Sequence, residues 1–250
     1  LQGKWSHIPQ IVKAHREFDR IKDQFPATPN PLPLTQLTGT LNDSIVLDIS
    51  SNPKKHGPNG SKPPYPSLHH RPRLSWIAPA TAFAKKYKTL GFDIDASRVQ
   101  ELQKQIDRTE TISSATLLSL SDNEQLQFTH HIDAIQHCNV FIVTVPTPVT
   151  NDKQPDLQPL KEACQLLGGL LQKNHIVVFE STVYPGCTEE ICVPILETTS
   201  GLTYNQDFFC GYSPERINPG DTTNTVETIV KVTAGSTPEI ADFVDRKSVV

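Results

Sequence analysis

Methionine is absent from all 250 positions of the chain, including the first. A sequence without an initiator residue is typical of an incomplete translation, and we expect this one to be part of a longer protein. A run of about 18 apolar residues is absent too, so the sequence predicts no membrane-spanning helix. The N-terminus lacks the basic and apolar regions of a signal peptide, which favours a cytoplasmic protein.

An excess of positive charge and the patterns of a metal site are also lacking. Lysine and arginine number 23 against 27 acidic residues, a net charge of −4, so no basic face for nucleic acid is predicted. The number of cysteines is odd, and they lack the paired spacing of zinc ligands, so we expect no bound metal ion. We interpret them as buried or half-buried free thiols in a reducing compartment. They are Cys138, Cys164, Cys187, Cys192 and Cys210.

The chain changes character near residue 80. Twelve of its 21 prolines lie at or before Pro79, and this half offers only two weak patterns. Apolar residues in 11–25 recur at roughly helical spacing, and 44–49 has the composition of a short strand. Neither has neighbours with which to form a core, so we expect 1–60 to be disordered. We divide the chain into an irregular segment 1–79, a domain 80–243 and an atypical tail 244–250.

From residue 80 onward, strand and helix patterns alternate. Apolar runs predict strands at 89–94, 126–129, 140–145, 176–179, 208–212 and 228–232. Helical spacing predicts helices after Asp95, at 157–171 and after Thr188; both residues are expected to cap a helix, and Pro194 to bend one. The run VFIVTV indicates a strand covered by helices on both faces. The alternation predicts an α/β fold with a doubly wound, parallel sheet.

In such a sheet a ligand binds beyond the carboxyl ends of the strands. Asp93 follows the first of these strands, where an acid can accept both hydroxyls of an adenosine ribose and repel a 2′-phosphate. An aspartate that merely caps a turn is the alternative interpretation. The loops 145–148 and 180–182 follow two further strands and offer stiffening prolines and threonine hydroxyls. Such residues are frequent at strand ends, so each loop by itself is a weak signal.

Five stretches together resemble the UDP-glucose/GDP-mannose dehydrogenase family, and within it the branch that acts on UDP-N-acetylhexosamines. They keep the family's order and spacing from about residue 80 to residue 243. The stretches are KKYKTLGFDID (85–95), NVFIVTVPTPV (139–149), QPDLQPL (154–160), VVFESTVYPGCTEE (177–190) and GYSPERINPGD (211–221). The resemblance implies a Rossmann-like, NAD-binding domain that is incomplete in this chain.

The resemblance also implies roles for single residues. Asp93 corresponds to the ribose-binding acid, and Arg98 to a basic residue that reaches the adenosine side. Thr182 corresponds to the threonine between the nicotinamide and the reacting carbon. Glu215 corresponds to the glutamate that positions water for thioester hydrolysis, with a surface carboxylate as the alternative, and Arg216 favours an N-acetylated sugar. The expected cofactor contacts in the two loops are Val145, Pro146, Thr147, Ser181 and Thr182.

The reaction implied is the oxidation of a sugar C6 hydroxyl to a carboxylate with two NAD⁺, for surface polysaccharide synthesis. A cysteine thiolate holds the aldehyde as a thiohemiacetal, and its oxidation gives a thioester that water opens. In the family pattern that cysteine lies downstream of residue 250, as do the sugar-nucleotide domain and the central helix through which full-length members form homodimers. We therefore expect the chain by itself to be inactive.

A glycine-rich loop, G-x-G-x-x-G, is missing from the sequence, although a dinucleotide fold needs one between its first strand and first helix. Its expected place lies directly before 81–87, which has the pattern of that helix's end. Reading codons 69–78 one base downstream permits Ile-Ile-Gly-Leu-Gly-Tyr-x-Gly-Leu-Pro, and the last glycine is forced because TGG followed by A yields GGA. We interpret residues up to about Pro79 as at least partly out of frame; a divergent N-terminus is the alternative.

Loss of the first strand, which is central in such a sheet, would open the edges of both neighbours. We therefore expect poor folding and no measurable NAD affinity.

Two other functions stay open. A β-hydroxyacid dehydrogenase shares the dinucleotide fold but does not account for YSPERINPGD, and it predicts an open downstream frame without the catalytic cysteine. A non-enzymatic remnant or binding module predicts stop codons in the downstream DNA.

Overall fold

The computed structural model describes residues 45–47, 76–150, 152–214 and 231–248, with side chains for all of these except 45–47 and 247–248. The described residues belong to one compact unit, Leu37–Val250. Within the described ranges, no helix combines the length and the apolar character that a membrane crossing requires.

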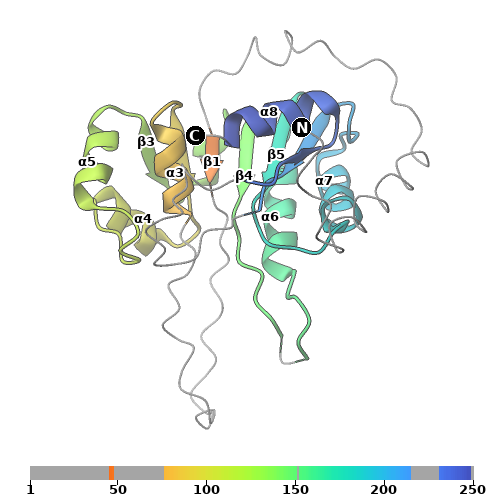
Figure 1. Cartoon of the computed structure of the whole chain (residues 1–250), viewed down its shortest axis with the longest axis horizontal. Coiled ribbons are helices and arrows are strands. Elements are labelled where there is room, and N and C mark those ends of the chain that lie inside the picture. Colours follow the sequence, from red (N-terminus) through yellow and green to blue (C-terminus); the bar gives the residue numbers. More distant parts are fainter. Residues whose placement is uncertain (1–44, 48–75, 151, 215–230, 249–250) are drawn as a thin grey trace, which may run out of the picture. The chain divides into compact units, whose positions relative to one another are not determined.

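The described strands form one seven-stranded sheet in the order β3-β2-β1-β4-β5-β6-β7 (Figure 1). Neighbours pair in parallel except β6 and β7, which are antiparallel. The strands are β1 (Ile45–Leu47), β2 (Thr89–Phe92), β3 (Leu126–Thr129), β4 (Val140–Val143), β5 (His175–Phe179), β6 (Phe208–Tyr212) and β7 (Ala234–Gly235). The prediction of a doubly wound, parallel α/β sheet is confirmed, with an antiparallel strand added at one edge.

The central strand comes from the segment in which we expected disorder. Ile45 of β1 is in register with Thr89 of β2 on one side and with Val140 of β4 on the other. Two of its three residues are β-branched, a type that favours strands. The strand pattern at 44–49 is therefore confirmed for 45–47, whereas the expected disorder of these residues and the loss of the central strand are wrong. Residues 1–44 and 48–75 lie outside the described part.

Helices cover both faces of the sheet, so the strands are buried on both sides. In β4, Val140 and Ile142 belong to one core cluster, while Phe141 and Val143 belong to the other. This alternation explains the continuous apolar run in the sequence. The first cluster includes side chains of α3 (Ile77–Ala84), α4 (Ala96–Gln103), α5 (Ser114–Asp122) and α8 (Pro238–Ser248). The second includes the 3₁₀ turn η3 (Ile132–Ile135), α6 (Gln158–Gly168) and α7 (Val193–Ser200).

Two helix starts test the capping predictions. The Asp95 carboxylate accepts hydrogen bonds from the backbone amides of Ser97 and Arg98, so its prediction as a helix cap is confirmed. Thr188 is not a cap, because it is the first residue of a π-helical turn, η4 (Thr188–Cys192), that precedes α7. Pro194 is the second residue of α7, which continues directly from η4, so its missing amide falls where the π-helical turn passes into the α-helix. The bend expected at Pro194 stays a prediction.

The C-terminal part also differs from the sequence prediction. The strand expected at 228–232 is not formed at its described residues, 231 and 232, and the edge strand is β7 instead. The last helix, α8, runs on to Ser248, and its Val244 is buried in the core. The boundary that we expected between 243 and the tail therefore lies within a helix.

Candidate functional site

The predicted site residues that follow β2, β4 and β5 lie at one edge of the sheet. β2 and β4 both flank β1, and β5 flanks β4, all in parallel. The carboxyl ends of parallel strands meet at the same edge, which is where doubly wound sheets bind their ligands. Asp93, Thr147 and Thr182 are thereby brought to this edge from three different strands. Glu215 and Arg216 lie outside the described residues.

The loops after β4 and β5 are joined by two hydrogen bonds. The Thr147 hydroxyl donates to the Thr182 carbonyl over 2.8 Å. In the opposite direction, the buried Ser181 hydroxyl donates to the Val145 carbonyl over 2.7 Å. These hydroxyls therefore hold the loops together, whereas the Thr182 side chain itself is exposed. Pro146 is exposed too, so the pair of loops presents Pro146 and Thr182 toward solvent.

A buried ion pair lies directly before the Ser181–Thr182 turn. The Lys231 ammonium is 2.9 Å from the Glu180 carboxylate, and the two side chains are 5% and 2% exposed. The Glu180 amide also donates to the Val143 carbonyl, which fixes the start of this loop to the end of β4. The pair therefore connects the β5 loop to the chain segment that leads into β7. Sequence reasoning missed it, because no spacing rule relates residues 51 positions apart.

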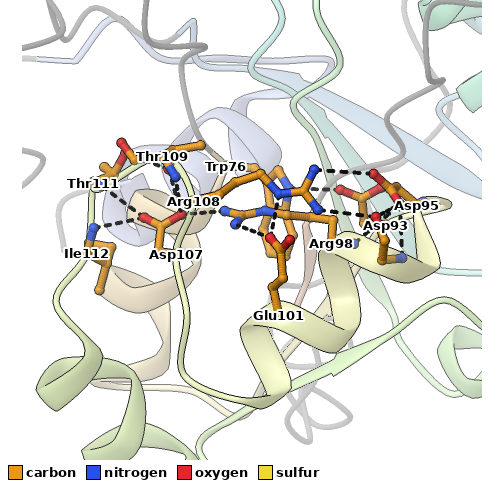
Figure 2. A network of polar contacts seen from close by, with 11 residues as sticks. Trp76, Asp93, Asp95, Arg98, Glu101, Asp107, Arg108, Thr109, Thr111 and Ile112 are labelled. Carbon is orange, nitrogen blue, oxygen red and sulfur yellow. Dashed lines mark hydrogen bonds and ion pairs between the residues drawn. The ribbon is translucent and has the colours of Figure 1, made fainter.

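Asp93 is enclosed rather than open to solvent. Its side chain is 3% exposed, and one carboxylate oxygen accepts the Asp95 amide over 2.8 Å. The other oxygen accepts a hydrogen bond from the Trp76 indole nitrogen over 3.3 Å. Figure 2 shows the indole beside Asp93, with the Arg98 and Arg108 side chains nearby. Asp93 thus lies at the predicted strand end, but its carboxylate is already used within the chain.

Arg98 is buried and bonded within the protein. Its guanidinium lies 2.6 Å from the Asp107 carboxylate, and the two side chains are 7% and 1% exposed. Burial opposes ionisation of Asp107, but hydrogen bonds from Thr109, Arg98 and the Ile112 amide outweigh it and lower the Asp107 pKa. The pair fixes the loop after α4. The adenosine-side role implied for Arg98 by the resemblance stays a prediction, and this guanidinium is engaged elsewhere.

Arg108 is the arginine that sequence reasoning missed. Its side chain is 44% exposed, lies 3.8 Å from Asp95 and pairs with Glu101 (Figure 2). The hydrogen bond with Glu101 raises the Arg108 pKa, and the nearby charges of Asp95 and Asp93 add to this effect. It lies in a loop without periodic pattern, so only the fold brings it to the acids. Arg108 offers an exposed positive charge on the Asp93 side of the site.

The cysteines fit the structural interpretation. All five are free and buried, as predicted. Burial raises the pKa of Cys187 to about 11, so its reactive thiolate form is scarce at neutral pH. In the described ranges, no group of three or more histidine, cysteine or acidic residues could hold a metal. A pocket beside β3, which includes Lys88, Gln127 and His137, contains none of the predicted site residues.

Known proteins resemble the segment that carries this geometry. The model of the UDP-glucose/GDP-mannose dehydrogenase family, NAD binding domain, matches residues 77–245. A UDP-N-acetyl-D-glucosamine 6-dehydrogenase of Pseudomonas aeruginosa is 55% identical over 166 residues, covering 66% of this chain and 39% of the relative. Its Salmonella typhi counterpart is 49% identical over 168 residues, covering 67% and 39%. The chain thus spans about two fifths of these relatives' length.

Solved structures share the fold. The UDP-D-ManNAc dehydrogenase from Pyrococcus horikoshii superposes with a TM-score of 0.67 at 22% identity, over 82% of this chain and 44% of that one. An NDP-N-acetyl-D-galactosaminuronic acid dehydrogenase from Methanosarcina mazei Go1 gives 0.69 at 19% identity, over 88% and 46%. The family match covers well over half of the sequence, and it contains Asp93, Thr147 and Thr182. The chain therefore belongs to the UDP-glucose/GDP-mannose dehydrogenase family, and residues 77–245 correspond to that family's NAD-binding domain.

Proposed function

We propose that the chain is the NAD-binding part of an enzyme that oxidises the C6 hydroxyl of a UDP-N-acetylhexosamine to a carboxylate, consuming two NAD⁺. The identity of 55% to a UDP-N-acetyl-D-glucosamine 6-dehydrogenase supports this sugar class. A relative at 46% identity carries the name protein CapL, which agrees with a role in surface polysaccharide synthesis.

One observation carries the proposal furthest: the Thr182 side chain is exposed on a loop that is fixed from three sides. The Thr147 hydroxyl bonds to the Thr182 carbonyl, and the Ser181 hydroxyl bonds to the loop after β4. Glu180, which directly precedes Ser181, is held by its ion pair with Lys231. A rigid, exposed hydroxyl at the carboxyl ends of the strands suits a contact between nicotinamide and the carbon that is oxidised. Asp93, at the end of β2, has the position that suits a ribose-binding acid.

The remaining roles follow the family resemblance. Glu215 positions water for thioester hydrolysis, and Arg216 contacts the substrate and selects an N-acetylated sugar. Five free thiols agree with a reducing compartment, which supports a cytoplasmic location. The catalytic cysteine and the helix of the homodimer belong to a part of the protein that follows residue 250 in the family pattern.

The frame hypothesis for the N-terminal segment stays a prediction. The family match begins at Ile77, directly after the tryptophan whose codon would read as glycine in the shifted frame. Sequencing the DNA that encodes 69–78 tests it: codons that cannot spell Gly-x-Gly one base downstream contradict the hypothesis.

Turnover by the complete reading frame tests the function. The gene is cloned with its downstream DNA, and the product is incubated with NAD⁺ and each of four UDP-sugars: the N-acetylated gluco, galacto and manno forms, and UDP-glucose. We expect two NADH per sugar with an N-acetylated substrate and slower turnover of UDP-glucose. Thr182→Ala should lower kcat by about 10- to 1,000-fold, since groups placed at the reacting centre contribute on this scale. Faster turnover of UDP-glucose, or oxidation of a β-hydroxy acid, contradicts the proposal.

A further inference from the structure

Trp76 lies between the start of α3 and the end of β2. Its ring contacts the bare backbone of Gly91, where an added Cβ would lie only 2.6 Å from the indole. On the same side it meets Phe128 edge-to-face, with ring centroids 6.0 Å apart. The residue is 7% exposed, so the indole is a fixed part of the core rather than a surface side chain.

The orientation of the ring matters for Asp93. The indole nitrogen is a donor without acceptor capacity, and it donates to one carboxylate oxygen of Asp93 while the Asp95 amide donates to the other (Figure 2). A ribose hydroxyl presents the same kind of donor to such an acid. A bound dinucleotide needs this carboxylate for its ribose hydroxyls, and at 3% exposure Asp93 offers neither oxygen to them. The residues as they stand therefore do not fit a bound adenosine ribose.

We infer that the Trp76 indole occupies the position of the adenosine ribose on Asp93, and that a dinucleotide binds only after this ring has moved away. The inference rests on the proposed function, in which Asp93 is the ribose-binding acid. A glycine in place of Trp76 would let the start of α3 lie close to the sheet with no side chain between them. The third glycine of a dinucleotide-binding loop has this role. Trp76 instead fills that space and satisfies the acid.

Calorimetry with NAD⁺ on two variants of the whole chain tests this assignment. Trp76→Gly removes both the ring and the donor, whereas Trp76→Phe keeps most of the ring volume and removes only the donor. A hydrogen bond to a charged group is worth about 10- to 100-fold in an equilibrium constant, so we expect Trp76→Gly to tighten NAD⁺ binding on that scale. Trp76→Phe should give a smaller gain. Asp93→Ala in the Trp76→Gly chain is the matched control and should abolish the gain.

Fluorescence gives a second measurement with Trp76 in place, since removal of a buried ring also lowers stability. The chain has two tryptophans, so in a Trp5→Phe variant the emission comes from Trp76 alone. As NAD⁺ binds, we expect the emission to shift to longer wavelength and quenching by acrylamide to increase, because the displaced indole meets water. NAD⁺ binding, measured by calorimetry, with unchanged Trp76 emission overturns the inference.

The outcomes separate this inference from the proposed function. If neither Trp76 variant binds NAD⁺ better than the parent chain, the indole is not the obstacle and the inference is wrong, whatever the complete enzyme oxidises. If Trp76→Gly gains affinity but the complete reading frame oxidises no UDP-sugar, the inference stands as a property of the dinucleotide site, and the proposed function fails.

Discussion

The Thr147 hydroxyl donates a hydrogen bond to the Thr182 carbonyl over 2.8 Å and so connects the loops of two neighbouring strands. The Ser181 hydroxyl returns a bond to the first loop at Val145. Each loop therefore supplies one donor and one acceptor to the other. The cofactor contacts that the resemblance implies for Thr147 and Ser181 stay predictions; in the structure, their hydroxyls hold the two loops together.

Replacing Thr147 by valine should loosen this connection. The variant keeps the shape of the side chain but loses the donor, and the Thr182 carbonyl loses its partner. We expect a loss of about 0.5–1.5 kcal/mol in the free energy of unfolding, measured by urea denaturation. Thr147→Ser, which keeps the hydroxyl, is the control and should retain most of the stability. No loss in Thr147→Val, or a larger loss in Thr147→Ser than in Thr147→Val, would show that the hydrogen bond contributes little to stability.

Breaking the Glu180–Lys231 pair should cost more, because both side chains are almost fully buried. Glu180→Gln or Lys231→Met alone breaks the ion pair while the other charge stays buried, and we expect each to cost about 3–5 kcal/mol in unfolding free energy. The double variant removes both charges and should be less destabilised than the sum of the single variants.

The exposed pair of Asp242 and Arg246 in α8 supplies the matched comparison, with side chains 52% and 61% exposed. Asp242→Asn should cost at most about 1 kcal/mol, because solvent screens this pair. Strictly additive losses for the Glu180 and Lys231 variants would refute their coupling.

Gly91→Ala should destabilise the sheet, because its Cβ would collide with the Trp76 ring and with Phe128 at 2.8 Å. Overpacking of this kind costs about 1–3 kcal/mol. Gly169→Ala is the control: the nearest atom to its Cβ is 3.5 Å away and its φ is −68°, so alanine fits there. Thermal denaturation should also show that Trp76→Gly reduces the cost of Gly91→Ala. If Gly91→Ala costs as much in the Trp76→Gly chain as in the parent chain, the added Cβ collides with Phe128 alone.

As the pH falls below neutral, protonation of His175 should lower the free energy of unfolding. Burial lowers the His175 pKa below its usual 6.5, and its Nδ1 accepts a hydrogen bond from the Gln172 amide. The folded state therefore favours the neutral ring, and this contribution is complete above pH 6.5 and is lost as the pH falls through the lowered pKa. Thermal midpoints measured between about pH 7 and pH 5 should fall less steeply in His175→Asn. Equal slopes in the parent chain and in His175→Asn would exclude His175.

The strands that consist of continuous apolar runs are predictable from the sequence. Strands such as 140–143 are buried on both faces, so their composition alone marks them, and their order then brings Asp93, Thr147 and Thr182 to one edge. The burial of Arg98 against Asp107 was not predictable in this way, because it depends on how a loop folds back onto α4. β1 is only three residues long and is separated from its partners by a long stretch of chain, so nothing local indicates that it pairs.

The family match and the sheet give different N-terminal limits for this domain. The family match starts at Ile77, yet the β2 and β4 backbones meet through Ile45–Leu47, a strand 30 residues upstream of that start. A recombinant piece trimmed to the matched range would keep every proposed cofactor contact but would lack the strand whose backbone hydrogen bonds join β2 to β4. Expression vectors, deletion series and domain swaps for this protein therefore need to begin before Ile45.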